Sequence, residues 1–393
     1  MSGADKRRLR LNSVNPDARR IIAGQAARAL AYGLGSVLLG VTLARHGRSG
    51  LVVGIVLTSI LAGNALVSVV IARYGDRTGR RRAYRLLFVG MAAAGTVFAL
   101  VGWLPALVLA ALTGTVSTDV VESGPFTSLE QAMLPNVAAG DPTRLFGTYN
   151  AVATIAGSFG ALLALATSSQ HALLLYPAAA GLGLLVTVKL SPAVELGQLS
   201  EGRSLERSRG IVVRMSALFA LDSFGGGFVP QTFIAYLFAR KYGASPHTLA
   251  LVFFAIGLLQ ALSFQAAVRI ARRIGLLRTM VFTHLPSNLL LVALAFAPNL
   301  TTAIALLLGR FALSQMDVPA RQAFVVAVVD PNERTAAAAY TNTARYATRP
   351  FAPLIAGVAL RGGLGVPFLA AGALKSVYDV GMYAFFRKTT VPA

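Results

Sequence analysis

The chain has 393 residues, of which 55% are hydrophobic and only 13% are charged, and its mean hydropathy is +0.65. A soluble domain carries about 25% charged residues, so this composition excludes an ordinary soluble protein and indicates one embedded in a lipid bilayer. The net charge of +21 does not indicate nucleic-acid binding, because the basic residues gather between apolar runs. The sequence contains no cysteine, which excludes disulfides, a thiolate metal site and a thiol nucleophile.

Apolar runs long enough to cross a bilayer repeat along the chain. A helix needs about 20 apolar residues to cross, and the alternating polarity of membrane barrel strands is not visible. Because lipid offers the backbone no hydrogen-bond partners, we predict an all-α membrane protein with about twelve transmembrane helices. The predicted ranges are 20–44, 50–72, 84–102, 106–129, 145–167, 171–190, 212–238, 247–269, 277–296, 301–326, 335–360 and 366–386.

Basic residues are distributed unevenly among the predicted tails and loops. The N-terminal tail 1–19, the linker 191–211, the C-terminal tail 387–393 and the loops after the second, fourth, eighth and tenth helices hold nearly all the loop lysine and arginine. By the positive-inside rule these segments are cytoplasmic, so we expect a multi-pass protein of the cell (cytoplasmic) membrane with both termini inside. The N-terminus does not look like a cleaved signal peptide, because the apolar run after it is too long.

The polar linker separates two halves, 20–190 and 212–386, that resemble each other. Leu129-Glu130-Gln131-Ala132 in the first half corresponds to Ala320-Arg321-Gln322-Ala323 in the second. An acidic turn follows each, and a tyrosine then enters the next helix, at Tyr149 and Tyr340. Two six-helix halves around a central cavity are a transporter architecture.

The densest charge lies between the second and third predicted helices, in the segment Ala72-Arg73-Tyr74-Gly75-Asp76-Arg77-Thr78-Gly79-Arg80-Arg81-Arg82. The simplest interpretation is a basic cytoplasmic loop. The segment also resembles the loop Gly-x-x-x-Asp-Arg-x-Gly-Arg-Arg/Lys of the major facilitator superfamily, with Ala72 in place of the first glycine. The matching positions are Asp76, Arg77, Gly79, Arg80 and Arg81. With the twelve spans and the linker, this resemblance covers nearly the whole chain.

The resemblance implies the fold of that superfamily and transport by alternating access. It also implies that residues 72–82 form a gate that closes the cytoplasmic side in the outward-facing state, through a charge network that is stable in one state and broken in the other. Small bacterial efflux proteins of the superfamily look most similar. Residues 223–228 and 314–319 look like a branch that includes arsenite exporters. The resemblance therefore favours export over import.

Ionisable residues inside membrane spans are costly and usually functional. In the superfamily the first, fourth, seventh and tenth helices line the cavity, and here each of these holds such a residue. They are Arg28, Asp119, Glu122, Asp222, Arg310 and Asp317. In a continuous helix Asp119 and Glu122 share one face, where mutual repulsion and burial favour protonation of one carboxylate. We expect Asp119, Glu122 and Asp222 to carry protons.

The repeat relates Asp119 to Arg310 and Arg28 to Asp222, so the two halves carry opposite charges at related depths. We expect Arg28 and Arg310 to be switching partners of the acids or substrate ligands. The run Gly225, Gly226 and Gly227 weakens the seventh helix, either as a gating hinge or for close packing.

Other charges in the spans have structural interpretations. Glu130 and Arg321, near helix ends, are expected to snorkel or to cap. Lys375 and Asp379 are four residues apart and are expected to form a salt bridge within the twelfth helix.

These patterns predict a monomeric secondary transporter that exports a small solute or toxic compound in exchange for protons. Its expected partners are the bilayer, protons and the solute; we expect no enzyme activity, cofactor, metal or nucleic acid, and the sequence contains no GxxxxGK[ST] loop for ATP. Two alternatives stay open. One is a proton-coupled importer of a sugar or organic anion, with Arg28 and Arg310 holding an anion. The other is a membrane receptor or scaffold that transports nothing.

Overall fold

The computed structural model describes residues 15–45, 48–117, 119–120, 124–137, 142–167, 169–195, 205–330 and 333–389. Within these ranges it gives no side chains at 72–73, 76–77, 135–136, 142–147, 326, 334–336 and 338–339. Every regular element in the described residues is helical. The predicted site residue Glu122, and the side chains of Asp76 and Arg77, lie outside the described part of the chain.

The first half of the chain forms seven α-helices and three short 3₁₀ helices within the described residues. They are α2 (Pro16–Arg45), α3 (Gly50–Thr78), α4 (Arg80–Leu100), α5 (Leu104–Leu112), α6 (Pro125–Val137), α7 (Pro142–Leu162), η1 (Leu163–Leu165), η2 (Gln170–Leu174), α8 (Leu175–Val188) and η3 (Pro192–Glu195).

The second half forms nine α-helices and one 3₁₀ helix within the described residues. They are α9 (Arg209–Gly227), α10 (Gln231–Tyr242), α11 (Pro246–Ile274), α12 (Leu276–Ala295), α13 (Leu300–Ser314), α14 (Asp317–Val328), α15 (Arg334–Thr348), α16 (Phe351–Ala359), η5 (Leu360–Gly362) and α17 (Val366–Phe386). Within the described residues, eight helical segments are long and apolar enough to cross a membrane. The other predicted spans correspond to α5 with α6, α13 with α14, α15 with α16, and α17.

Four spans that the sequence predicted as continuous helices are interrupted. The interruptions separate α5 from α6, α9 from α10, α13 from α14, and α15 from α16. Pro230 and Pro350 lie in two of them, where the missing N–H ends the helical hydrogen bonding. Gly114 and Gly124 in the first have φ of 64° and 61°, which is outside helical geometry. Irregular backbone at membrane depth is tolerated where it lines a cavity.

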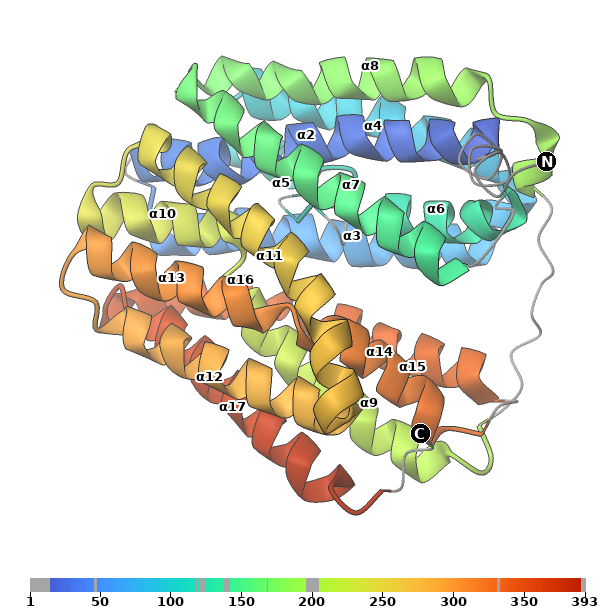
Figure 1. Cartoon of the computed structure of the whole chain (residues 1–393). Helices are drawn as coiled ribbons and strands as arrows, with labels where there is room; N and C mark the ends of the chain where they lie inside the picture. The colour runs from blue at the N-terminus through green and yellow to red at the C-terminus, as the bar shows by residue number, and fades with distance from the viewer. Residues whose placement is uncertain are drawn as a thin grey trace, which may run out of the picture.

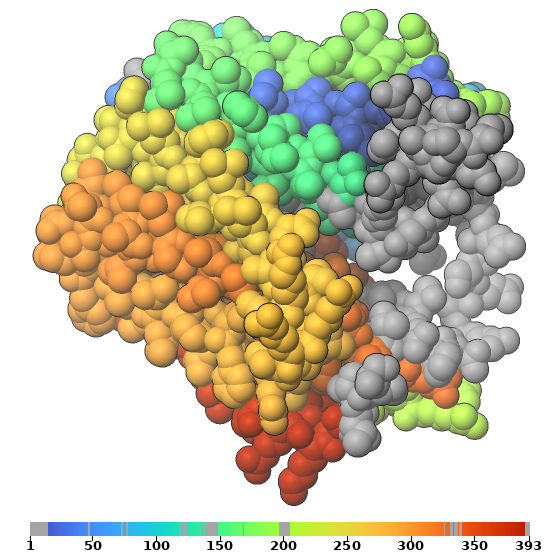
Figure 2. Space-filling view, in the orientation of Figure 1, coloured from blue at the N-terminus to red at the C-terminus, as the bar shows by residue number. Residues whose placement is uncertain are grey.

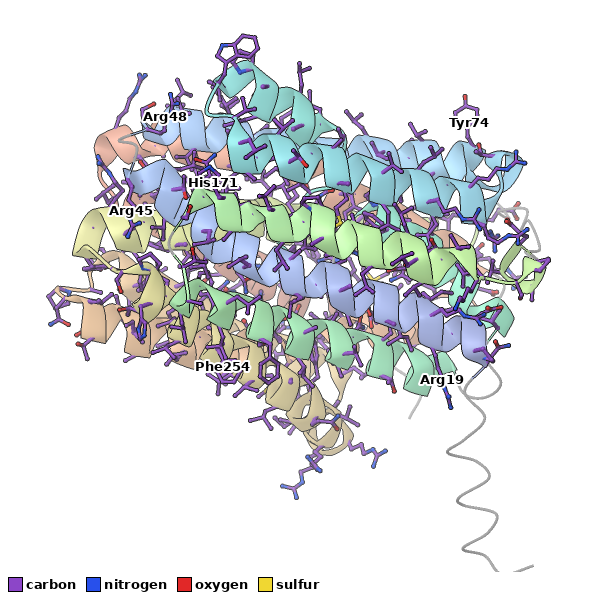
Figure 3. All side chains as sticks on the ribbon, turned by 90° about the horizontal axis from the view of Figure 1, so that it is seen from above. Arg19, Arg45, Arg48, Tyr74, His171 and Phe254 are labelled. Carbon is purple, nitrogen blue, oxygen red and sulfur yellow. The ribbon has the colours of Figure 1, made fainter. Side chains whose placement is uncertain are left out.

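The helices form two groups, α2–α8 and α9–α17, that meet at one end and diverge toward the end that holds both termini (Figures 1 and 2). We call the meeting end the far end and the other the termini end. Between the groups α2 packs on α10, α3 on α16 and α7 on α11. Arg45, Arg48 and His171 lie at the far end, whereas Arg19 and Tyr74 lie at the termini end (Figure 3).

Glycines allow the two groups to touch at the far end. A Cβ built on Gly357 of α16 would lie 2.3 Å from the carbonyl oxygen of Gly50 in α3. A Cβ on Gly40 of α2 would lie 2.4 Å from the carbonyl oxygen of Thr232 in α10. Both distances are shorter than van der Waals contact, so a side chain at either glycine would push the groups apart. The far end is therefore closed by direct backbone packing.

Candidate functional site

A cavity of about 380 Å³ lies between the two groups. All four helix interruptions contribute to its lining, through Asp119, Val229, Gln315 and Arg349 among others. The charged residues that line it are Asp119, Asp222, Arg310, Asp317, Arg321, Arg345, Arg349 and Lys375. Four of the predicted site residues therefore meet in one cavity: Asp119, Asp222, Arg310 and Asp317. Broken helices place these polar groups near the middle of the bundle, as in transporters whose sites lie at the bilayer midplane.

An ion pair between described residues crosses the cavity and joins the two halves. The guanidinium of Arg349, between α15 and α16, lies 2.9 Å from the carboxylate of Asp119, between α5 and α6. Asp119 is not helical, and its backbone N–H donates to the hydroxyl of Ser117. The prediction that Asp119 and Glu122 share a helix face was therefore wrong for Asp119. Its charge is directed at the opposite half instead.

A second cluster surrounds Asp222, which is only 4% exposed although it lines the cavity. Lys375 of α17 donates to one carboxylate oxygen, and Arg321 of α14 lies 3.3 Å from the other. His284 of α12 lies 3.9 Å from the first oxygen. Three helices thus bring basic groups to one buried carboxylate, which offsets the cost of its burial.

The same cluster corrects two structural predictions. Lys375 and Asp379 do not pair with each other: Lys375 reaches α9, and Asp379 bonds to His284 at 2.9 Å and to Asn288 at 2.8 Å. These partners come from neighbouring helices that pack on α17. Arg321 does not snorkel at a helix end, because it is buried and bonded to Asp222.

In the first half a related pair is sealed away from the cavity. Two nitrogens of Arg28 donate to the carboxylate of Glu130 at 2.6 and 2.9 Å, and Tyr84 and Tyr149 also donate to it. Arg28 is 1% exposed and Glu130 0% exposed, and the guanidinium lies 4.4 Å from the ring centroid of Phe126. Glu130 therefore neither snorkels nor caps, and Arg28 does not line the cavity.

The two pairs occupy corresponding places with their signs exchanged. The internal repeat relates Arg28 to Asp222 and Glu130 to Arg321, and each half joins its two residues, as Arg28–Glu130 and Asp222–Arg321. The signal for these partners was thus present in the repeat. It was missed because helix position alone placed Glu130 and Arg321 at the membrane boundary.

The glycines of α9 lie against two of the charged residues. A Cβ on Gly225 would lie 3.0 Å from Lys375, and one on Gly227 would lie 2.6 Å from the carbonyl oxygen of Arg349. Gly227 ends α9, and α10 begins at Gln231. In this conformation the glycines permit close approach, and their role as a hinge stays a prediction.

At the termini end the described part of the 72–82 loop is bound to the start of the linker. Gly79, with φ of 87°, separates α3 from α4. The backbone N–H groups of Arg80 and Arg81 donate to Glu195 at 2.6 and 3.2 Å, and the Arg81 side chain donates at 3.0 Å. Burial by itself raises the pKa of Glu195, but these hydrogen bonds together lower it below its usual value. Glu195 thus fixes the start of α4 to the linker.

A bundle of two helical halves around a charged cavity, with interrupted helices lining it, defines a membrane transporter rather than an enzyme. The chain belongs to the Major Facilitator Superfamily, whose family model matches residues 21–353. It is 24% identical over 420 residues to the "Uncharacterized membrane protein YJR124C" of Saccharomyces cerevisiae, covering 94% of each chain.

Solved structures of transporters share its fold. The nucleoside transporter NupG has a TM-score of 0.74 at 14% identity, covering 95% of this chain and 99% of its own. The D-xylose-proton symporter has a TM-score of 0.74 at 16% identity, covering 95% and 98%. The resemblance to the superfamily, the all-α two-half fold and the multi-pass membrane location are confirmed. The arsenite-exporter branch stays a prediction.

Proposed function

We propose that the protein is a monomeric, proton-coupled secondary transporter that moves a small solute by alternating access, with export in exchange for protons as its direction. The observation that carries this proposal is Asp222, a buried carboxylate at the cavity surface held between Lys375, Arg321 and His284. An acid neutralised by basic groups on other helices can accept a proton when those helices move away.

The position of Asp222 in α9 links protonation to motion. Asp222 lies one turn before Gly225–Gly227, where α9 ends. A bend there shifts Asp222 relative to Lys375 in α17 and Arg321 in α14. The carboxylate then loses part of its charge compensation and takes up a proton, because a buried unpaired charge is costly. The related Glu130 is sealed by Tyr84 and Tyr149, so we assign coupling to the second half.

Alternating access requires one closed and one open end. The far end is closed by the glycine contacts, and the halves diverge toward the termini (Figure 1). With cytoplasmic termini, as loop charge predicts, this conformation is inward-facing. The opposite conformation separates α2 from α10 and α3 from α16, and we propose that the 72–82 loop then closes the termini end.

An importer is the second candidate, since rocking halves can serve either direction. The observation that favours it is Arg310, a buried cation of the cavity that forms no hydrogen bond or ion pair with a described residue. Arg310 would hold the organic anion of such an importer when the cavity faces outward, because one site serves both states of an alternating-access cycle. Direction is tested separately from coupling, by reversing the imposed gradient.

The coupling proposal is tested in proteoliposomes carrying wild type, Asp222→Asn or Glu206→Gln, with solute pools screened under an imposed pH gradient. Glu206 is exposed and serves as the matched control. Wild type and the control are expected to accumulate solute against its gradient. Asp222→Asn is expected to retain solute exchange but to lose accumulation driven by the pH gradient. Full accumulation by Asp222→Asn would refute the coupling assignment.

A further inference from the structure

The cavity holds a basic side chain that the described part of the protein leaves without a partner. Arg310 of α13 is 7% exposed and lines the cavity. Among the described residues its guanidinium forms no ion pair within 4.0 Å and makes no hydrogen bond, and its buried Nε is unsatisfied. A buried, unpaired guanidinium carries a large desolvation cost. That cost is offset when an anion enters the cavity.

The three described carboxylates that line the cavity are already engaged in ion pairs. Asp119 is paired with Arg349, and Asp222 with Lys375 and Arg321. Asp317 lies 3.4 Å from Arg321. The described lining therefore contains five lysine and arginine side chains and three carboxylates, each carboxylate with a basic neighbour. Arg310 adds positive charge that no described acid neutralises by contact.

Groups next to Arg310 complete a recognition site. Ser314 lies one helical turn further along α13, also lines the cavity, is 6% exposed, and its hydroxyl has no partner among the described residues. Residues four apart share a helix face. The guanidinium lies 4.6 Å from the ring centroid of Phe311, which limits its orientation. Phe253 and Phe264 add aromatic surface to the same cavity.

We infer that the transported solute is a small organic anion, with a carboxylate or similar oxyanion bound by Arg310 and Ser314 and an apolar body against the aromatic lining. Arginine presents a planar pair of donors that matches two oxygens of an oxyanion. The hydroxyl of Ser314 supplies a further donor. Arg28 takes no part, because Glu130 already neutralises it. The inference rests on the proposed function, since it names the solute of the same cavity.

Binding without any gradient tests the inference separately from transport. Purified full-length protein is titrated by calorimetry and thermal melting with benzoate, phenylphosphate and lactate, with neutral benzamide and cationic benzyltrimethylammonium as charge controls. At least one anion is expected to bind and to raise the melting temperature, whereas benzamide and the cation have no effect. Arg310→Gln is expected to weaken anion binding by about 10-fold or more, the loss of one charge-assisted contact. Ser314→Ala should be intermediate, and the exposed Arg272→Gln should be unchanged.

A labelling experiment keeps the inference testable if Arg310→Gln does not fold. The chain lacks cysteine, so Gln315→Cys places a single thiol in the cavity lining. The anion that binds is expected to slow maleimide labelling of this thiol, and benzamide is not. Equal binding of neutral and anionic probes, no binding of any anion, or unchanged affinity in Arg310→Gln would overturn the inference. Anion binding without gradient-driven flux would instead contradict the proposed function.

Discussion

Replacing Gly357 by alanine should shift the transporter away from the conformation described above. The new methyl group would lie 2.3 Å from the carbonyl oxygen of Gly50, on the other half of the molecule. Normal contact lies at about 3.5 Å, so α3 and α16 must separate by about 1 Å. The oxygen is a backbone atom and the backbone fixes the position of the alanine Cβ, so the contact cannot be relieved by a side-chain rotation.

The magnitude follows from the cost of overpacking. An extra methyl group in a well-packed interface costs about 1–3 kcal/mol. This cost applies where the far end is closed and disappears where the halves separate. At about 1.4 kcal/mol per factor of ten, the equilibrium should move about 5- to 150-fold toward the conformation open at the far end.

Labelling of single cysteines in the cysteine-free chain measures this shift. Thr232→Cys reports on the far end, because Thr232 is 0% exposed in α10 beside Gly40. Gln322→Cys, exposed in the cavity lining, reports on the termini end. Gly357→Ala should raise labelling at the first position and lower it at the second. Gly181→Ala is the matched control, since nothing lies within 4 Å of its added Cβ. Unchanged labelling in Gly357→Ala would refute the assignment of the α3–α16 contact as the closed gate.

Three further predictions follow from other charged groups. Asp119→Asn or Arg349→Gln should each lower flux about tenfold, because each breaks the ion pair across the cavity. The exchanged pair Asp119→Arg with Arg349→Asp should recover most of the flux in a double-mutant cycle. No recovery would contradict a role for the ion pair itself. Hydrogen bonds from the backbone N–H groups of residues 206, 207 and 208 hold the pKa of Glu333 at about 2, below its ordinary value of about 4.3. Because the pKa of Glu333 is depressed, its carboxylate stabilises the fold above about pH 4 and loses this effect as the pH falls toward about 2. Glu333→Gln should therefore melt at a lower temperature than wild type at about pH 7, and the difference should shrink on acidification. A constant difference would contradict stabilisation by these backbone hydrogen bonds. Export of a monovalent anion in exchange for one proton moves two charges per cycle, which is worth about 4.6 kcal/mol at about 100 mV. A membrane potential imposed with valinomycin should therefore drive this export. Anion–proton symport moves no net charge and should not respond.

The fold class could be predicted from the sequence because a chain in lipid can satisfy its backbone hydrogen bonds only as helices or closed barrels. Apolar runs of span length predict helices, and the motif at residues 72–82 indicates the superfamily to which the chain belongs. Helix ends were predicted to within a few residues where the sequence carries a break, as at Gly102–Pro105 and Pro298–Asn299.

The interruptions within the spans could not be predicted from the same pattern. Residues 113–117, where α5 has ended, carry no charge, and Thr115, Val116 and Ser117 are buried in protein, so the uncharged run continues through the break. The partners of Lys375 and Arg321 also depend on which helices pack side by side, and a linear pattern of residues does not specify this. The four-residue spacing predicted a pair between Lys375 and Asp379. In the structure Lys375 pairs with Asp222 instead, and Asp379 pairs with His284.

Position in the fold, and not residue type alone, decides whether an arginine is a candidate ligand of a solute in the cavity. Arg28 and Arg310 had the same sequence interpretation. In the structure Arg28 is neutralised by Glu130, whereas Arg310 reaches the cavity and makes no ion pair with a described residue. Their different surroundings separate a structural counter-ion from a candidate substrate ligand.

Proton-linked flux in sealed proteoliposomes tests the central claim most directly. With a pH gradient imposed and the interior pH followed by a trapped dye, addition of the transported solute should move protons in wild type. The same addition should move none in Asp222→Asn, although that variant still exchanges solute. Proton movement of wild-type size in Asp222→Asn would contradict the claim that this carboxylate couples protons to transport.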